Sequence, residues 1–479
     1  MRLLPLTLTL ALLGGCSMMP DYERPDVARI NVWNTPTKAD LADANTHWQE
    51  IFSDPQLQQV IDLGLSNNQD LRQALLNVEY YRAEYRIQRA ELIPEITVDG
   101  SGYRQRLPGD YNGTGDAYIS DQYTATVGLT SYELDLFGRI RSLKAQALEN
   151  YFAQEQNRRS AQLTLVANIA NAYLDLVADR NQLQLAKQTR QIEADNLALV
   201  RKRYELGVAS EMELAQAQAV AEDAEVTLTL YQRLEQLSRN ALTLLIGTQL
   251  PADWEPAKQL DVAIIADVQP GLPSELLNRR PDILAAEHQL RAANANIGAA
   301  RALYFPIISL TANAGAMSSD LNSLFDSGSD TWLLYPSITL PIFTGGRIDA
   351  QVEESEIQHQ VALSQYQQAV QNAFTEVSNA LTNRDGYVRQ LASQERAMEA
   401  YQRYFRIADQ RYREGIDSML TRLDAQRNLV ASQQATIDAR LALLQAKVDL
   451  YRALGGGWQD QDTSPETEAV STTEATQTP

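Results

Sequence analysis

Residues 203–210 read RYELGVAS and residues 411–418 read RYREGIDS, so one short motif occurs twice in the chain. The two copies lie 208 residues apart. Further landmarks precede each motif in the same order. They are RAELIPEITV at 89–98 and LDLFGRI at 134–140, then RALYFPIISL at 301–310 and LPIFTGGRI at 340–348. Several landmarks that recur in one order indicate an internal duplication.

Each copy predicts the order helix, two strands, long helix, turn and helix. The first helix is expected from about Asp54 to Ile93, because an Asp-Pro pair starts it and a proline follows its end. Its counterpart is expected to start at Pro273 or Ser274 and to end before Pro306. After these helices the pattern of apolar residues changes.

Alternating apolar and polar residues predict two strands in each copy. Ile308 and Leu310 flank Ser309, and a period of two with one apolar face is typical of a half-buried strand. The four strands are expected at about 95–106, 121–136, 306–317 and 331–343.

The longest helical signal follows the first strand pair. Residues 139–206 contain no proline, and a helix of that length would reach roughly 100 Å at about 1.5 Å per residue. Its apolar positions have the 3-4-3-4 spacing of a coiled coil, at Leu163, Val166, Ala170, Tyr173 and Val177. This periodicity alone fits a dry helical bundle as well as the wall of a channel.

The start of the chain predicts a lipoprotein signal peptide at residues 1–15. Its apolar stretch, 3–13, is shorter than the roughly 20 residues that a membrane-spanning helix needs. LGGC at 13–16 is typical of a lipobox, so Cys16 is expected to carry a diacylglyceryl group and an acyl chain. Ser17 favours sorting to the outer membrane. Cys16 is the single cysteine, which excludes an intramolecular disulfide.

Charge and hydropathy restrict the partners. A net charge of −20 argues against nucleic acid, since phosphate binding requires clustered Lys and Arg. After the signal peptide no apolar run approaches 20 residues, so any further membrane crossing must use strands. Four strands cannot close a barrel, and open edges in hydrocarbon leave unpaired backbone groups. Two, three or four chains would have to pool their strands, unless the sheet is soluble and caps the helices.

The sequence predicts no enzyme. His47, His288 and His359 are scattered, and no HExxH, GxSxG or phosphate-binding glycine loop occurs. No metal site and no cofactor beyond the lipid on Cys16 are expected.

Four longer motifs resemble one known family. They are LDLFGRIR at 134–141, GLPSELLNRRPDILAAEHQL at 271–290, ANIGAARALYFPIISLT at 295–311 and DLYRALGGGW at 449–458. The chain resembles the outer membrane factor family, the TolC-like exit ducts of tripartite efflux pumps, and is most similar to the lipid-anchored OprM-type branch. The resemblance implies an α+β fold and a homotrimer, in which each chain gives four strands to a twelve-stranded transmembrane β-barrel. A long periplasmic α-helical barrel and a mixed α/β equatorial domain would continue it.

The resemblance also implies a division of the chain. The expected segments are the signal peptide 1–15, a lipid-anchored equatorial segment 16–53, a first repeat 54–246, an equatorial connector 247–272, a second repeat 273–454, and an equatorial segment with a disordered acidic tail 455–479.

The two repeated turns, at about 204–212 and 412–420, would lie at the periplasmic tips of helical hairpins. Under the resemblance they dock a periplasmic membrane-fusion adaptor through Gly207, Val208, Ala209, Ser210, Gly415, Ile416, Asp417 and Ser418. The residue types also suit the turns themselves. Either glycine fits the left-handed residue that ends a helix, and either serine can cap the next helix.

A periplasmic gate is implied beyond the second turn. Leu420, Asp424 and Arg427 match the family's constriction pattern, and spacings of four and three place them on one helix face. Leu420 would narrow the opening, and Asp424 would pair with Arg427 or Arg411, with Tyr412 nearby. Apart from the family, such a pair is an ordinary solvated contact worth about 0.3 kcal/mol. The first turn lacks an obvious ion pair, so the second hairpin is expected to do more of the gating.

The predicted function is passive export of drugs or other amphiphilic compounds from an inner-membrane RND-type pump and its adaptor to the exterior. The alternatives are a duct of the same fold for metal ions or proteins, and a periplasmic structural lipoprotein without a pore.

Overall fold

The computed structural model describes residues 17–26, 47–112, 115–268 and 276–456. The predicted signal peptide, Cys16 and the acidic tail lie outside the described residues. Two compact units divide the chain. The first takes described residues from Met1–Asp26, Asn77–Glu155 and Ala285–Gln367, and the second from Val27–Leu76, Gln156–Leu284 and Gln368–Pro479. Each unit therefore contains parts of both sequence repeats.

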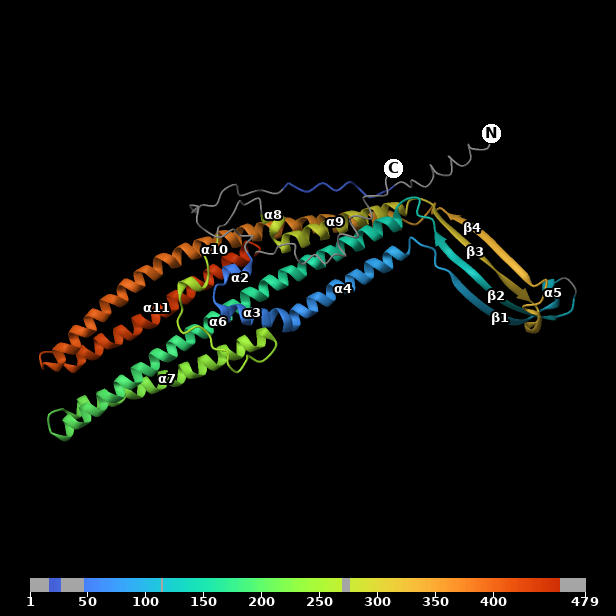
Figure 1. The fold of residues 1–479 in the computed structure, drawn as a ribbon. Coiled ribbons are helices and arrows are strands. Elements are labelled where there is room, and N and C mark those ends of the chain that lie inside the picture. Colours follow the sequence, from blue (N-terminus) through green and yellow to red (C-terminus); the bar gives the residue numbers. More distant parts are fainter. Residues whose placement is uncertain (1–16, 27–46, 113–114, 269–275, 457–479) are drawn as a thin grey trace. The chain divides into compact units, whose positions relative to one another are not determined.

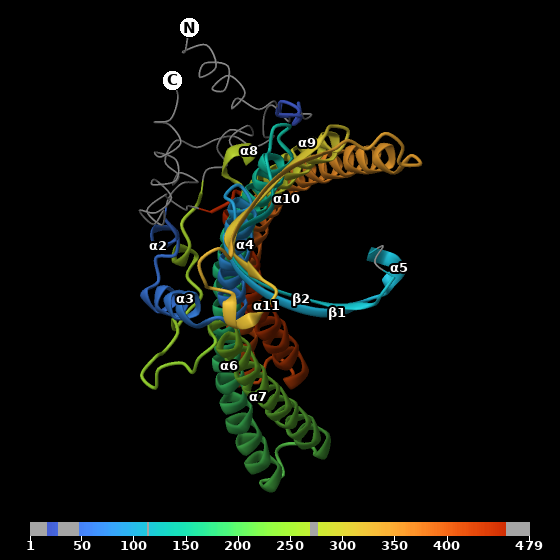
Figure 2. The same ribbon diagram turned by 90° about the vertical axis from the view of Figure 1, so that its right-hand side faces the viewer.

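The first unit contains one antiparallel sheet of four strands in the order β1-β2-β3-β4 (Figure 1). The strands are β1 Thr97–Leu107, β2 Tyr118–Glu133, β3 Ile307–Ser318 and β4 Asp330–Thr339. Val127 of β2 pairs with Val98 of β1 on one side and with Ala314 of β3 on the other. The strand pairs of the two repeats thus join into a single sheet, which is strongly curved in Figure 2.

The ends of the return strands were predicted too late in the chain. β2 ends at Glu133 and β4 at Thr339, whereas the sequence pattern continued to about 136 and 343. Pro341 lies two residues beyond the end of β4, and proline has no N–H to donate to a strand ladder, although this edge strand accommodates Pro336. The short helix α5 Gly109–Asn112 and the 3-10 helix η3 Leu321–Ser323 lie between the paired strands.

Close approach of strands explains one glycine in the sheet. A Cβ at Gly128 would lie 2.2 Å from the carbonyl oxygen of Ala312, so only glycine fits this position. Along β4, Trp332, Leu334 and Ile338 are largely exposed and share one face, because side chains alternate in a strand. A single copy of the chain leaves this apolar face uncovered.

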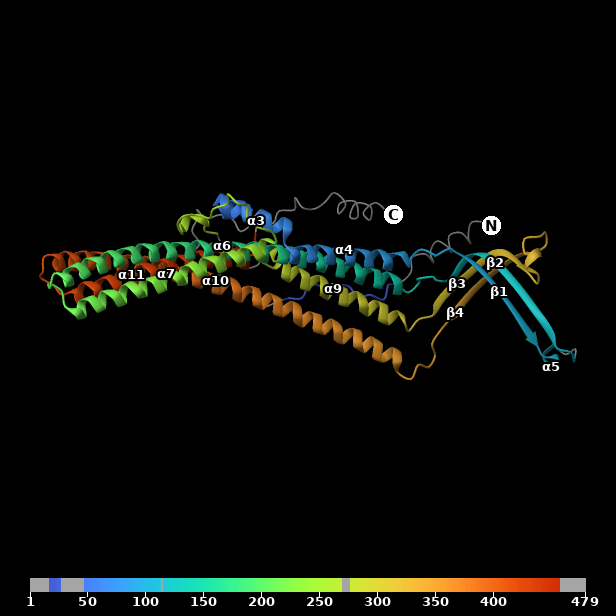
Figure 3. The same cartoon turned by 90° about the horizontal axis from the view of Figure 1, so that it is seen from below.

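Two long helices follow the strand pairs. They are α6 Arg139–Glu205 and α10 Arg347–Arg413, each of 67 residues, and each turns back into a shorter helix, α7 Glu211–Ile246 and α11 Met419–Ala453 (Figure 3). The first of these spans confirms the prediction for 139–206. No helix in the described part of the chain combines the length and apolarity needed to cross a membrane.

The helix predicted from Asp54 to Ile93 is wrong as a single helix. It is divided into α3 Pro55–Asn67 and α4 Gln69–Ala90. Asn68 causes the break: its Oδ1 accepts a hydrogen bond from the amide of Leu71 at 2.9 Å, and its Nδ2 donates to the carbonyl of Leu245 at 2.8 Å.

The second repeat is broken at the matching place, between α8 Leu276–Arg279 and α9 Pro281–Ala302. There the guanidinium of Arg280 donates to the carbonyl of Ala453 at 2.9 Å and pairs with Asp282 and Glu376. The predicted start at Pro273 or Ser274 lies outside the described residues.

The connector between the repeats packs against the helices of the second unit. It includes η1 Val262–Ile264, and Ile265 bridges Phe52, which follows α2 Trp48–Ile51. Tyr173 of α6 is fully buried here, donates to Asp54 and accepts a hydrogen bond from the amide of Ala257 at 2.9 Å. Burial raises the pKa of the Tyr173 hydroxyl.

The segment that follows the predicted lipidation site lies on α9 within the first unit. Asn294 donates to the carbonyl of Pro20 at 2.8 Å, and Arg24 forms an ion pair with the buried Glu287 at 2.7 Å. Gly298 leaves space for the segment, since a Cβ there would lie 2.7 Å from the Cα of Met19. Residues 17–26 are therefore held by specific contacts.

Candidate functional site

The first predicted tip is a tight turn between α6 and α7. Gly207 has a φ of 74°, the left-handed conformation that glycine adopts without strain. Ser210 caps α7 in a capping box with Glu213, because each side chain bonds the backbone N–H of the other. Glu213 is thereby engaged at the turn. Leu206 and Val208 are exposed, whereas Ala209 is buried, so the tip presents two apolar side chains.

The second tip repeats this backbone between α10 and α11. Gly415 has the same φ of 74°, and the hydroxyl of Ser418 accepts a hydrogen bond from the amide of Thr421. Arg411 donates two hydrogen bonds across the turn to Asp417, at 2.7 and 3.0 Å. These bonds hold the pKa of the Asp417 carboxyl below its ordinary value. The glycine and serine roles predicted for both turns are confirmed.

The residues predicted to form a gate are only partly brought together. Arg427 pairs with Asp424 at 2.8 Å, and Leu420 is 65% exposed one turn before them. Arg411, however, bonds to Asp417. The hydroxyl of Tyr412 accepts a hydrogen bond from Arg203 of the first hairpin at 2.8 Å, so Tyr412 connects the two hairpins.

A second ion pair, which the sequence did not predict, is largely buried between α10 and α11. Nε of Arg422 is 2.8 Å from a carboxylate oxygen of Asp409, and the two side chains are 9% and 17% exposed. The guanidinium also lies near the rings of Phe405 and Tyr412, at 6.0 and 5.8 Å from their centroids. Arg422 therefore joins α11 to the end of α10.

A second missed residue is Glu193 of α6, which is 3% exposed. Its carboxylate accepts a hydrogen bond from Gln426 of α11. Burial raises the pKa of Glu193, and the charge of Arg422 partly offsets that effect. The sequence did contain a signal, because Ala186, Glu193 and Val200 are seven residues apart, and a charged residue at a coiled-coil seam is unusual.

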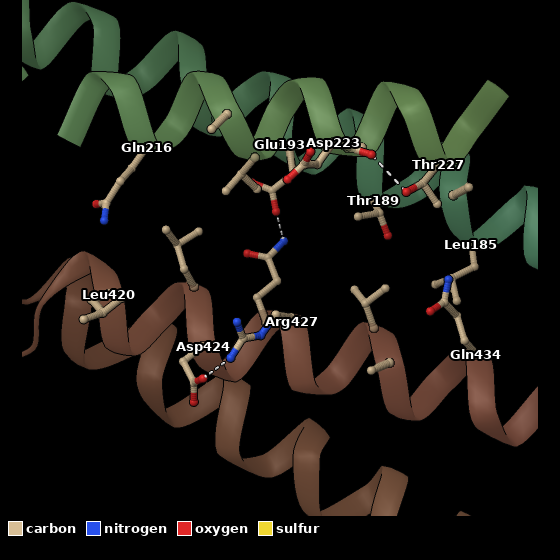
Figure 4. Close-up of a pocket in the computed structure, with 18 residues that line it drawn as sticks. Leu185, Thr189, Glu193, Gln216, Asp223, Thr227, Leu420, Asp424, Arg427 and Gln434 are labelled. Atoms are coloured by element: carbon tan, nitrogen blue, oxygen red, sulfur yellow. Dashed lines mark hydrogen bonds and ion pairs between the residues drawn. The ribbon is translucent and has the colours of Figure 1, made fainter. Parts of the chain in front are cut away.

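Glu193 and Gln426 border a groove of about 540 Å³ between α6, α7 and α11 (Figure 4). Leu420 lies toward one end and Gln434 toward the other, with the Asp424–Arg427 pair on the α11 side. No cluster of three metal-ligating side chains occurs among the residues described. The groove is thus a mixed apolar and acidic surface between the two hairpins.

Comparison with known proteins identifies the family. A family model described as outer membrane efflux protein matches residues 60–248 and 272–456. The chain belongs to this family. The two matched segments agree with the duplication seen in the sequence, and the family consists of transport proteins.

Relatives and solved structures of the family agree along almost the whole chain. The probable efflux pump outer membrane protein TtgC of Pseudomonas putida is 49% identical over 465 residues, which cover 96% of each chain. Outer membrane protein OprJ of Pseudomonas aeruginosa is 39% identical over 94% of each chain. The open state of the Neisseria gonorrhoeae MtrE outer membrane channel has a TM-score of 0.86 and 36% identity, covering 94% of this chain and 100% of that chain.

These matches confirm the predicted family, the TolC-like α+β fold, the outer-membrane location and the role as exit duct of an efflux system.

Proposed function

We propose that three copies of the chain form a passive exit duct and that each copy gives its four strands to one twelve-stranded barrel. The sheet carries this proposal. β1 and β4 are its edges, and Trp332, Leu334 and Ile338 leave an apolar face exposed on β4. In a membrane, edge strands must find partners, and apolar side chains face lipid. In the proposed trimer, neighbouring copies pair with the edge strands, and the lipid bilayer covers the apolar side chains.

The tips are the proposed contact with a periplasmic adaptor, which links the duct to an RND-type pump. Leu206, Val208 and Ile416 support this role, because three largely exposed apolar side chains are placed at two rigid turns. The cargo is proposed to be antibiotics and organic solvents. Relatives that are 45–49% identical are named toluene, antibiotic and solvent efflux pump outer membrane proteins.

Leu420, Asp424 and Arg427 are proposed to narrow the periplasmic entrance until the adaptor binds. Two observations support this assignment: Leu420 is largely exposed, and the Asp424–Arg427 ion pair is exposed to solvent where it lines the groove. Arg411 and Tyr412 act on the gate indirectly, by fixing the second turn and by bonding to the first hairpin. The lipid on Cys16 is proposed to anchor the chain to the inner leaflet.

Deletion of the gene tests the cargo. The deleted strain should become sensitive to toluene and to several antibiotics, and the full-length gene should restore growth. A variant with Gly415 and Ser418 changed to valine should not restore growth. This variant should still reach the outer membrane, and native mass spectrometry of the purified protein should show a trimer. Normal resistance of the deleted strain, or a monomeric protein, would contradict the proposal.

Planar-bilayer recording tests the gate. Asp424→Ala should raise the leak conductance of the isolated duct several-fold, because it releases Arg427 and removes a carboxylate from the entrance. Glu222→Ala is the matched control, since Glu222 is an exposed acid of α7 outside the groove residues. Equal conductance of both variants would remove Asp424 from the gate.

A further inference from the structure

The groove between the hairpins has the dimensions of a small-molecule site. Its volume of about 540 Å³ lies in the range of roughly 300–1,000 Å³ that is typical of ligand pockets. α6 forms one side, and α7 and α11 form the others (Figure 4). Its aliphatic lining comes from all three helices and includes Leu185, Ala219, Val220, Leu423 and Val430.

The charged groups that line the groove are predominantly acidic. Glu193, Asp223 and Asp424 are its carboxylates, and Arg427 is its one cationic lining residue. Arg427 is already paired with Asp424. Asp223 is exposed, and no ion pair of its carboxylate is found among the described residues. The lining therefore carries three carboxylates against one guanidinium, which leaves the groove with a negative balance.

Glu193 adds an independent sign of an incomplete site. It reaches from α6 toward α11, where one carboxylate oxygen accepts a hydrogen bond from Gln426 (Figure 4). The other oxygen, Oε2, is buried and has no hydrogen-bond partner within the described part of the chain. Asn196 and Arg422 are its polar neighbours: Nε of Arg422 forms the ion pair with Asp409, and the charge of its guanidinium offsets the burial of Glu193 only in part. A buried carboxylate with an open lone pair favours a cation nearby, since Coulomb attraction is strong where water is excluded.

We propose that this groove binds an organic cation with a hydrocarbon body, one ligand in each chain. The ammonium or phosphonium centre would lie between Asp223 and Glu193, and the hydrocarbon would cover the aliphatic side chains. Such a ligand would contact α6, α7 and α11 together, so it would link the two hairpins beside Leu420. This accessory site goes beyond the proposed function, since it does not depend on which compounds cross the duct.

Binding of tetraphenylphosphonium to the full-length protein in zwitterionic nanodiscs tests the proposal. An ion-selective electrode measures the free cation, and empty discs give the background. We expect saturable binding of one cation per chain. Glu193→Gln combined with Asp223→Asn should weaken it about tenfold or more, because the charge-assisted contacts are lost. Ala219→Trp should abolish it by filling the groove.

Two controls separate charge from lipophilicity and from misfolding. Glu222→Gln changes the acid next to Asp223 outside the groove and should leave the affinity unchanged. Tetraphenylborate has the same shape and the opposite charge, and should show no saturable binding. Equal binding of the two ions, equal affinity of the double variant, or no binding above empty discs would overturn the proposal. None of these outcomes bears on drug resistance or conductance, so failure of this site and failure of the duct are distinguishable.

Discussion

Removal of one carboxylate, Asp409→Ala, should loosen the second hairpin far more than its place on a polar helix suggests. Arg422 is only 9% exposed and would keep a buried charge without its partner. Breaking a buried ion pair in this way costs about 3–5 kcal/mol. Asp409 is itself 17% exposed, so water can reach the site in part, and about 3 kcal/mol is the expected loss.

Hydrogen exchange of the backbone amides at residues 405–420 measures this loss locally. A decrease of about 3 kcal/mol in opening free energy corresponds to roughly hundredfold faster exchange. Arg413→Ala is the matched control, because Arg413 also pairs with Asp409 at 2.8 Å but is 75% exposed. Its loss should cost at most about 1 kcal/mol. Replacing both Asp409 and Arg422 by leucine should restore most of the protection. Exchange in Asp409→Ala no faster than in Arg413→Ala would refute the reasoning.

Three further predictions concern other parts of the molecule. Gly298→Ala should displace residues 17–26, lower the stability of that contact by about 1–3 kcal/mol and make the segment sensitive to protease. Gly386 lies in open space within α10, so Gly386→Ala should stabilise the helix by about 0.5–1 kcal/mol, as measured by thermal unfolding. Burial and the charge of Asp179 raise the pKa of Asp175 above its ordinary value of 3.8. The ionised carboxylate therefore lowers the stability of the folded protein at neutral pH, and this loss disappears as the pH falls through the raised pKa toward 3.8. Asp175→Asn should therefore raise the unfolding temperature at pH 8 and lose this advantage near pH 4; a gain independent of pH would contradict it.

Local signals determined how much of the fold could be predicted. The strands and the long helices were found because alternation, coiled-coil spacing and the absence of proline act over many consecutive residues. The break at Asn68 was missed because it depends on a carbonyl 177 residues away, at Leu245. A continuous helical pattern in sequence does not reveal such a tertiary partner.

The candidate site shows the same limit. The Asp424–Arg427 pair followed from a spacing of three residues on one helix. Arg411 was the alternative partner for Asp424, and it bonds to Asp417 instead, because the turn brings that carboxylate to its guanidinium. Gln426, the partner of Glu193, lies 233 residues along the chain, so the seam position of that acid was visible in sequence but its contact was not.

The two tips show how one duplicated backbone can acquire two behaviours. Gly207 and Gly415 have the same φ of 74°, yet Leu214 occupies the first-repeat position that matches Arg422. Leu214 packs against the apolar cluster around Met419. Separating these surfaces exposes apolar side chains to water, which is unfavourable because water forms no compensating hydrogen bonds with them. Arg422 is held by a charge instead, and water can replace Asp409 as its partner once the tip opens. Because Met419 belongs to α11, moving the second tip exposes the same apolar cluster, and it also breaks the Arg422–Asp409 pair wherever α10 and α11 separate.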